Sequence, residues 1–251
     1  MELTLLGTGG GPRPSPHRAP TAQSVRVGGR TIVVDAGNGV AQQMARAGLN
    51  PADLSDLLIT HLHVDHAADL GMLPMAAWIT GRTESMRVWG PPPTASSFWS
   101  LIDGYADDLV HRTASTGRPD FRSLVTAQDV ATAGTVFEDA DVRVSAALVN
   151  HPPFEVALAY RVDSADGSIA ISGDTTPCDA MVDLARDVDV LVHEVVHPTA
   201  LTQLAQGTNA STIKQHMVDS HTMLDHVGQV AQRAGARLLV LSHLIPHTGV
   251  S

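Results

Sequence analysis

Short apolar runs that alternate with segments of helical periodicity restrict this chain to a small set of folds. Runs rich in Val, Ile and Leu are typical of buried strands, and their alternation with helices favours a layered α/β domain over an all-α or all-β one. Five of the predicted strands lead directly into a side chain that can bind a metal ion. These strands are 57–60, 142–148, 168–172, 188–193 and 237–242.

The remaining elements follow from the same periodicity and from turn residues between the runs. Further strands are expected at 3–6, 24–27, 31–35, 87–89 and 157–162, and helices at 40–47, 67–75, 96–108, 179–187, 213–218 and 223–234. The dipeptide Asp166-Gly167 predicts a hairpin between 157–162 and 168–172. Nothing in the sequence divides the chain, so residues 1–251 are expected to form a single domain.

The densest group of metal-type side chains follows strand 57–60, in the run His61-Leu62-His63-Val64-Asp65-His66. His61 and His63 are two residues apart, so in extended chain their side chains leave on the same side. Asp65 and His66 stand at the start of the next predicted helix and can turn towards a second ion. Four metal-type side chains within six positions are unlikely to serve only as polar surface residues, so they indicate a metal site.

Other candidate ligands follow the later strands: His151, Asp174, His193-Glu194 and His243. Loops at the carboxyl ends of strands in open α/β sheets point into a shared cleft, so these side chains are expected to converge. Imidazole and carboxylate suit zinc, with iron or manganese as alternatives, and an aspartate can bridge two ions through its two oxygens.

The sequence Thr60-His61-Leu62-His63-Val64-Asp65-His66 resembles the His-x-His-x-Asp-His signature of the metallo-β-lactamase superfamily. Further segments resemble its ribonuclease Z and arylsulfatase-like branch, namely 6–10, 34–37, 89–91, 172–175, 193–194 and 220–222. The resemblance implies an αββα four-layer sandwich, two metal ions and often a homodimer.

The same resemblance implies roles for individual residues. His61, His63 and His151 would hold one metal ion, Asp65, His66 and His243 a second, and Asp174 would bridge them. His221 matches a histidine outside the ligand set that serves as a general acid, and Glu194 would orient it. Asp65 would also act as a base while remaining a ligand, which makes Asp65, His221 and Glu194 the candidate catalytic residues.

Two departures from ribonuclease Z bear on the substrate. That family usually ends its last ligand strand with an aromatic-Ser-Pro-Arg pattern, whereas this chain has His243-Leu244-Ile245-Pro246-His247 and no arginine there. The sequence also shows no long Gly/Pro-tipped insertion that would form a tRNA-binding arm. The formal net charge of −10 should on average repel a polyanion. Nucleic acid is therefore not the expected partner.

Two cations close together lower the pKa of a bound water and stabilise the entering and departing oxygens of an in-line displacement. A small phosphodiester is therefore the first expected substrate. The same groups would serve an esterase, lactonase or arylsulfatase, and tRNA 3′ endonuclease activity is the third alternative.

Two further segments remain open to interpretation. The loop Gly7-Thr8-Gly9-Gly10-Gly11 is followed by prolines that prevent a helix, so it is expected to allow close backbone approach to the metal cleft and not to bind a nucleotide. Residues 96–121 hold four of the nine aromatic residues. They would form either a surface helix packed inward or the lid of a pocket.

The expected compartment is the cytoplasm. The single cysteine, Cys178, excludes an internal disulfide framework and is compatible with a reducing environment. The first residues lack the pattern of a signal peptide, and no apolar run approaches the roughly 18 residues that span a bilayer.

Overall fold

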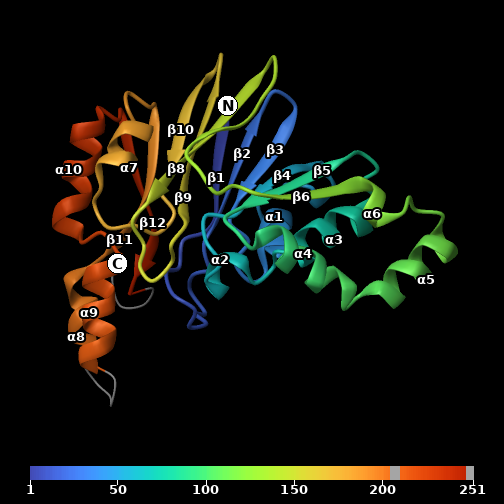
Figure 1. Ribbon diagram of the computed structural model, residues 1–251, viewed down its shortest axis with the longest axis horizontal. Coiled ribbons are helices and arrows are strands. Elements are labelled where there is room, and N and C mark those ends of the chain that lie inside the picture. The colour runs from blue at the N-terminus through green and yellow to red at the C-terminus, as the bar shows by residue number, and fades with distance from the viewer. Residues whose placement is uncertain (204–209, 247–251) are drawn as a thin grey trace.

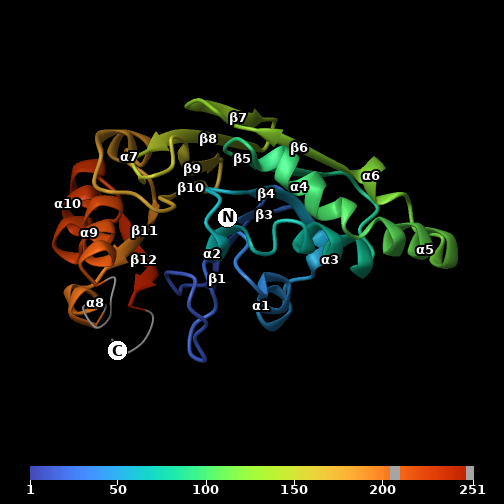
Figure 2. The same cartoon turned by 60° about the horizontal axis from the view of Figure 1, so that its bottom comes forward.

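The computed structural model describes residues 1–203 and 210–246, and His247 of the sequence analysis lies outside them. Two six-stranded sheets face each other across an apolar core, and helices cover the outer face of each (Figures 1 and 2). Each sheet is built from one half of the chain, in unbroken sequence order. This arrangement is the predicted αββα sandwich, and the α/β class is confirmed.

The first sheet has the order β1-β2-β3-β4-β5-β6. Its strands are β1 Glu2–Gly7, β2 Ala22–Val27, β3 Arg30–Val34, β4 Leu54–Leu58, β5 Met86–Gly90 and β6 Val125–Asp129. The first three strands are antiparallel neighbours, and β3 to β6 run parallel. The parallel part places the end of β4 at the edge where the histidine-rich run begins.

The second sheet has the order β12-β11-β10-β9-β8-β7. Its strands are β7 Gly134–Glu138, β8 Val142–Val149, β9 Ala157–Ser164, β10 Gly167–Ile171, β11 Val190–Val196 and β12 Leu238–Ile245. The predicted hairpin between β9 and β10 is confirmed, with Gly167 opposite Ser164. Strands β10, β11 and β12 run parallel, so their carboxyl ends lie at the same edge.

Helices form the two outer layers. The first half of the chain contributes α1 Val40–Arg46, α2 Val64–Ala67, α3 Met72–Thr80, α4 Thr94–Asp103, α5 Ala106–Thr116 and α6 Phe121–Leu124, with a 3-10 turn, η1, at Pro51–Asp53. The second half contributes α7 Asp179–Leu184, α8 Pro198–Gln203, α9 Ala210–Ser220 and α10 Leu224–Ala234. Figure 1 shows α8 and α9 beyond the carboxyl ends of β11 and β12, away from the outer layer formed by α7 and α10.

Three buried clusters correspond to the three interfaces between layers. Val25, Ile32 and Leu58 of the first sheet pack with Val144, Tyr160 and Val192 of the second. A second cluster joins the first sheet to α1, α3 and α4, and a third joins the second sheet to α7 and α10. The apolar positions of the central strands therefore lie on both of their faces, as expected for sheets covered on both sides.

Several predicted boundaries are wrong. The helix expected at 67–75 is not continuous: α2 ends at Ala67 and α3 begins at Met72. Between them, the Asp69 carboxylate accepts hydrogen bonds from the backbone N–H groups of Gly39 and Val40 at the start of α1. The helix expected at 96–108 is divided by Gly104 into α4 and α5. Strands β6 and β7 were not predicted, because both are largely exposed edge strands with few apolar residues.

Residues 96–121 contribute buried side chains to the outer face of the first sheet, although most of α5 is exposed. Phe98 and Phe121 are fully buried in the cluster that joins that sheet to its helices. None of the residues 96–121 lines the cavity at the candidate site described below. The interpretation of this segment as surface helices packed on the sheet is therefore confirmed. The alternative, a lid over the pocket, is wrong. None of the described helices combines the length and apolar character needed to cross a bilayer.

Candidate metal centre

The histidine-rich run lies between the end of β4 and the short helix α2. His63 is the N-cap residue of α2, so Asp65 and His66 fall in its first turn, where the sequence analysis expected them. His61, Asp65 and His66 are buried, and His63 is partly exposed. Burial of charged and titratable side chains is costly unless they are paired or bind a metal ion.

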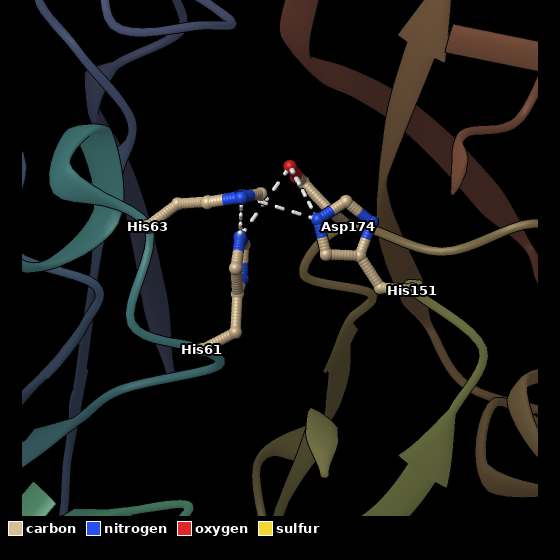
Figure 3. Close-up of side chains that lie close together, drawn as sticks. All are labelled: His61, His63, His151 and Asp174. Atoms are coloured by element: carbon tan, nitrogen blue, oxygen red, sulfur yellow. Dashed lines mark hydrogen bonds and ion pairs between the residues drawn. The ribbon is translucent and has the colours of Figure 1, made fainter. Parts of the chain in front are cut away.

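The second half of the chain brings its candidates to the same place. His151 follows β8 by two residues and Asp174 follows β10 by three. Figure 3 shows His61 and His63 on one side and His151 and Asp174 on the other, with their polar atoms pointing towards one another. The candidate site therefore needs both halves of the sandwich.

The strand-end prediction is wrong for β11 and β12. His193, Glu194 and His243 lie inside these strands, because β11 and β12 extend to Val196 and Ile245. The register shifts between Glu194 and Val195, which leaves His243 as a bulge residue with a φ of 43°. A bulge re-aims a side chain, and here it directs His243 towards Asp65 and Asp174.

Three histidine nitrogens converge in the first group of candidate ligands. His63 Nδ1 lies 3.0 Å from His61 Nε2 and 3.2 Å from His151 Nε2. Asp174 Oδ2 lies 3.7 Å from His61 Nε2 and 3.9 Å from His151 Nε2. Ligands at the usual zinc distances in a tetrahedron stand about 3.4 Å apart, so these spacings fit a zinc ion.

The second group meets the first at the same carboxylate oxygen. Asp174 Oδ2 lies 3.3 Å from both His66 Nε2 and His243 Nε2, and Asp65 Oδ2 lies 3.3 Å from His243 Nε2. The sequence analysis expected Asp174 to bridge through two oxygens. In the structure every distance given above for Asp174 is measured to its Oδ2 atom. Its Oδ1 atom has no hydrogen-bond partner among the described residues.

The opposite ring nitrogens are held by residues that the sequence analysis did not assign. Nδ1 of His66 donates to Asp35 Oδ2 at 2.8 Å, and Nδ1 of His151 donates to the backbone carbonyl of Ser220 at 2.8 Å. Such contacts orient a ligand histidine and leave its other nitrogen for the metal. Asp35 lies in segment 34–37, which the sequence analysis matched to the ribonuclease Z-like branch, so its role could have been found from the sequence. The contact with the Ser220 carbonyl could not, because a backbone carbonyl has no sequence signature.

The protonation states of the first group of histidines also suit a metal. Burial lowers the pKa of His61, His63 and His151, that of His63 to about 4, so these rings are neutral at pH 7. Metal ligands must be deprotonated. Burial raises the pKa of the Asp65 carboxyl, but the hydrogen bond with His243 and the nearby charges of His66 and His243 together outweigh this and hold the pKa at about 2.

Glu194 and His221 form a buried pair beside the two groups. Nδ1 of His221 donates to Glu194 Oε1 at 3.0 Å, and the backbone N–H of Thr175 donates to the same oxygen at 2.9 Å. Burial alone would lower the pKa of His221, but the Glu194 carboxylate raises it to about 9. The pairing that the sequence motif predicted is therefore present.

These observations test whether the residues fit a pair of metal ions. His66 Nε2 is buried beside Asp174 and has no hydrogen-bond partner among the described residues. One hydrogen on His63 Nδ1 could serve only one of the two nitrogens beside it. A cation in each group accounts for both features, so the residues fit.

A cavity of about 600 Å³ opens beside this cluster, within the range of about 300–1,000 Å³ usual for small-molecule sites. His63, Asp65, Asp174, His221 and His243 line it. The glycine-rich loop approaches it closely, as predicted. A Cβ at Gly10 would lie 2.9 Å from His243 Nδ1.

A family model described as the beta-lactamase superfamily domain matches residues 30–244, which include every candidate ligand. The chain belongs to the metallo-β-lactamase superfamily. Ribonuclease Z of Mycobacterium sp. (strain KMS) is 36% identical over 250 residues, which cover 98% of this chain and 85% of that protein. Ribonuclease Z of Mycobacterium bovis (strain BCG / Pasteur 1173P2) is 33% identical over 252 residues, which cover 99% of this chain and 88% of that protein.

Solved structures share the metallo-β-lactamase fold at lower identity. Human tRNase Z, short form, superposes with a TM-score of 0.74 at 21% identity and covers 97% of this chain and 92% of its own. The metallo-beta-lactamase fold protein YhfI from Bacillus subtilis superposes with a TM-score of 0.72 at 19% identity, and the match covers 99% of this chain and 87% of that protein. The predicted superfamily and its ribonuclease Z-like branch are confirmed, and with them assignment as a hydrolase.

Proposed function

We propose that this chain hydrolyses small phosphodiesters with two zinc ions. One ion would be held by His61, His63 and His151, and the other by Asp65, His66 and His243. Asp174 would bind both ions. The observation that carries the proposal is the position of Asp174 Oδ2, within 4 Å of histidines from both groups. Two bound cations would lower the pKa of a water between them and offset negative charge on the phosphate.

Three side chains, those of Asp65, His221 and Glu194, would have different roles in this reaction. Asp65 accepts the proton of the attacking water, whose oxygen forms a bond to phosphorus as the bond to the departing alcohol oxygen breaks. His221 donates a proton to that oxygen. Glu194 is a positioning residue, because its hydrogen bond fixes Nδ1 of His221 as a donor and leaves Nε2 to carry the transferred proton.

Hydrolysis of a tRNA precursor is the second candidate function, and a specific observation favours it. The relatives at 33–36% identity are named ribonuclease Z. The formal charge of −10 favours the small substrate. Carboxylic ester, lactone or sulfate ester hydrolysis would use the same residues. The cytoplasmic location, the single domain and a homodimer remain predictions.

The test is turnover of the zinc-loaded protein on a substrate panel. The panel holds bis(p-nitrophenyl) phosphate, p-nitrophenyl acetate, p-nitrophenyl sulfate, a lactone and a tRNA precursor with a 3′ trailer. The Asp174→Ala variant, treated identically, gives the background. We expect kcat/KM to be highest for the phosphodiester.

Cleavage of the tRNA precursor at a kcat/KM above that of the small phosphodiester would replace the first function by the second. Higher turnover of the ester, sulfate or lactone would exclude phosphodiester hydrolysis as the main activity.

A further inference from the structure

The cavity beside the candidate metal centre has two walls of different chemistry. One wall consists of the candidate ligands and His221, and the other consists of residues 10–14, part of α9 and the end of β12. The proposed reaction uses the first wall and leaves the second without a role.

The loop that forms part of the second wall is fixed against β12. Leu244 N–H donates to the Thr8 carbonyl at 2.8 Å, and Gly10 N–H donates to the Leu244 carbonyl at 3.2 Å. A Cβ at Gly10 would lie only 2.6 Å from Ile245 Cγ1. The loop therefore has little freedom to move away from the cavity.

Arg13 extends this loop along the cavity between two prolines, Pro12 and Pro14. Each proline fixes its own φ, which stiffens the backbone on both sides of the arginine. Arg13 is exposed and makes no hydrogen bond or ion pair within residues 1–203 and 210–246. Among the residues described, it is also the single Lys or Arg that lines the cavity.

An unpaired guanidinium beside a catalytic cavity favours an anionic ligand. Guanidinium groups bind phosphate and carboxylate oxygens through charge-assisted hydrogen bonds. Many other arginines of the chain already have carboxylate partners, such as Arg233 with Asp179 at 2.6 Å and Arg237 with Asp189 at 3.0 Å. Arg13 has its charge available for a substrate.

The rest of the second wall is mainly apolar. Ile213 and Met217 stand four residues apart on α9 and share a face of that helix. Ile245 and Pro246 continue the wall at the end of β12. Such a surface binds an uncharged organic group by removing it from water.

We propose that this cavity selects a phosphodiester with an apolar aryl or alkyl substituent, that Arg13 pairs with its negative charge, and that Ile213 and Met217 contact the substituent. This inference rests on the proposed phosphodiesterase function and names its substrate class.

Binding of diphenylphosphinate to the zinc-loaded protein tests the role of the charge. This anion has two apolar rings and no P–O–C bond to hydrolyse, so isothermal titration calorimetry measures binding without turnover. Arg13→Gln should raise its Kd about tenfold. Arg46→Gln is the matched control, because Arg46 is exposed, lies outside the cavity and has no partner in the described part of the chain. Equal Kd values for the two variants would overturn the role of Arg13.

The apolar wall is tested with the same anion and its dimethyl analogue. We expect diphenylphosphinate to bind at least about tenfold more tightly than dimethylphosphinate. Ile213→Ser should reduce this preference, whereas Val218→Ser, exposed on the same helix and outside the cavity, should preserve it. Equal binding of the two anions by the wild type would overturn the apolar subsite.

Failure of this inference differs from failure of the proposed function. A protein that hydrolyses phosphodiesters but binds both phosphinates alike refutes only the substrate class. A protein that shows both binding preferences but hydrolyses no phosphodiester refutes only the reaction.

Discussion

At the scale of single residues, His221 separates proton donation from metal binding. Its Nδ1 bonds to Glu194, and it is not among the seven proposed ligands. His221→Ala should therefore retain both metal ions and the fold. Loss of a general acid costs about 10² to 10⁴ in rate. The loss should be greatest for substrates with poor leaving groups and smaller for nitrophenyl phosphodiesters, whose leaving groups need little protonation.

Rates for one good and one poor leaving group, measured together with metal content, decide the role of His221. Loss of metal from His221→Ala would make the residue a ligand. Unchanged turnover of the poor leaving group would show that the proton comes from another group.

Asp35 provides a second test at this scale. Its carboxylate accepts hydrogen bonds from His66 Nδ1 and from the Thr60 backbone N–H, the latter at 2.8 Å. Asp35 has a φ of 62°, which asparagine tolerates well. Asp35→Asn should therefore fold but weaken metal binding about 10- to 100-fold, because it no longer holds His66 by a charged acceptor.

Competition with a chromophoric chelator measures that affinity, and circular dichroism checks the fold. A folded Asp35→Asn variant with wild-type affinity for both ions would show that Asp35 does not tune the site.

At the scale of elements, the packing of the glycine-rich loop against β12 predicts the effect of a single methyl group. Gly10→Ala would place a Cβ 2.6 Å from Ile245 Cγ1 and 2.9 Å from His243 Nδ1. Overpacking of this kind typically costs about 1–3 kcal/mol. We expect a lower Tm together with weaker metal binding, because the displaced residue is a proposed ligand.

Gly228→Ala is the matched control, since no atom lies within 4 Å of a Cβ at that position in α10. It should leave metal binding unchanged and slightly raise Tm, because alanine favours a helix. Identical metal affinity and Tm for Gly10→Ala and the wild type would show that the loop can move aside.

The strands show where sequence reasoning ends. Apolar runs predicted the buried strands, because burial on both faces requires nearly continuous Val, Ile and Leu. The bulge at His243 depends on the register between β11 and β12, which the sequence of neither strand shows alone. The edge strands β6 and β7 carry too few apolar residues to stand out.

At the scale of the whole molecule, the sequence predicted the layers and the set of side chains that the structure brings together, but not the contacts that orient them. All seven proposed ligands lie in one cluster because the segments after β4, β8 and β10 and the bulge in β12 meet at the same end of the two sheets. The carbonyl of Ser220 and the choice of one Asp174 oxygen depend on how the two halves pack together. Neither leaves a pattern in the sequence.

The central claim is that the two halves of the sandwich hold two metal ions through Asp174. Elemental analysis of protein reconstituted with zinc and dialysed against metal-free buffer tests it most directly. The wild type should hold about two ions per chain, and Asp174→Ala should lose both because it removes the oxygen that the two groups share. A wild type with close to zero ions, or an Asp174→Ala variant that keeps two, would contradict the account.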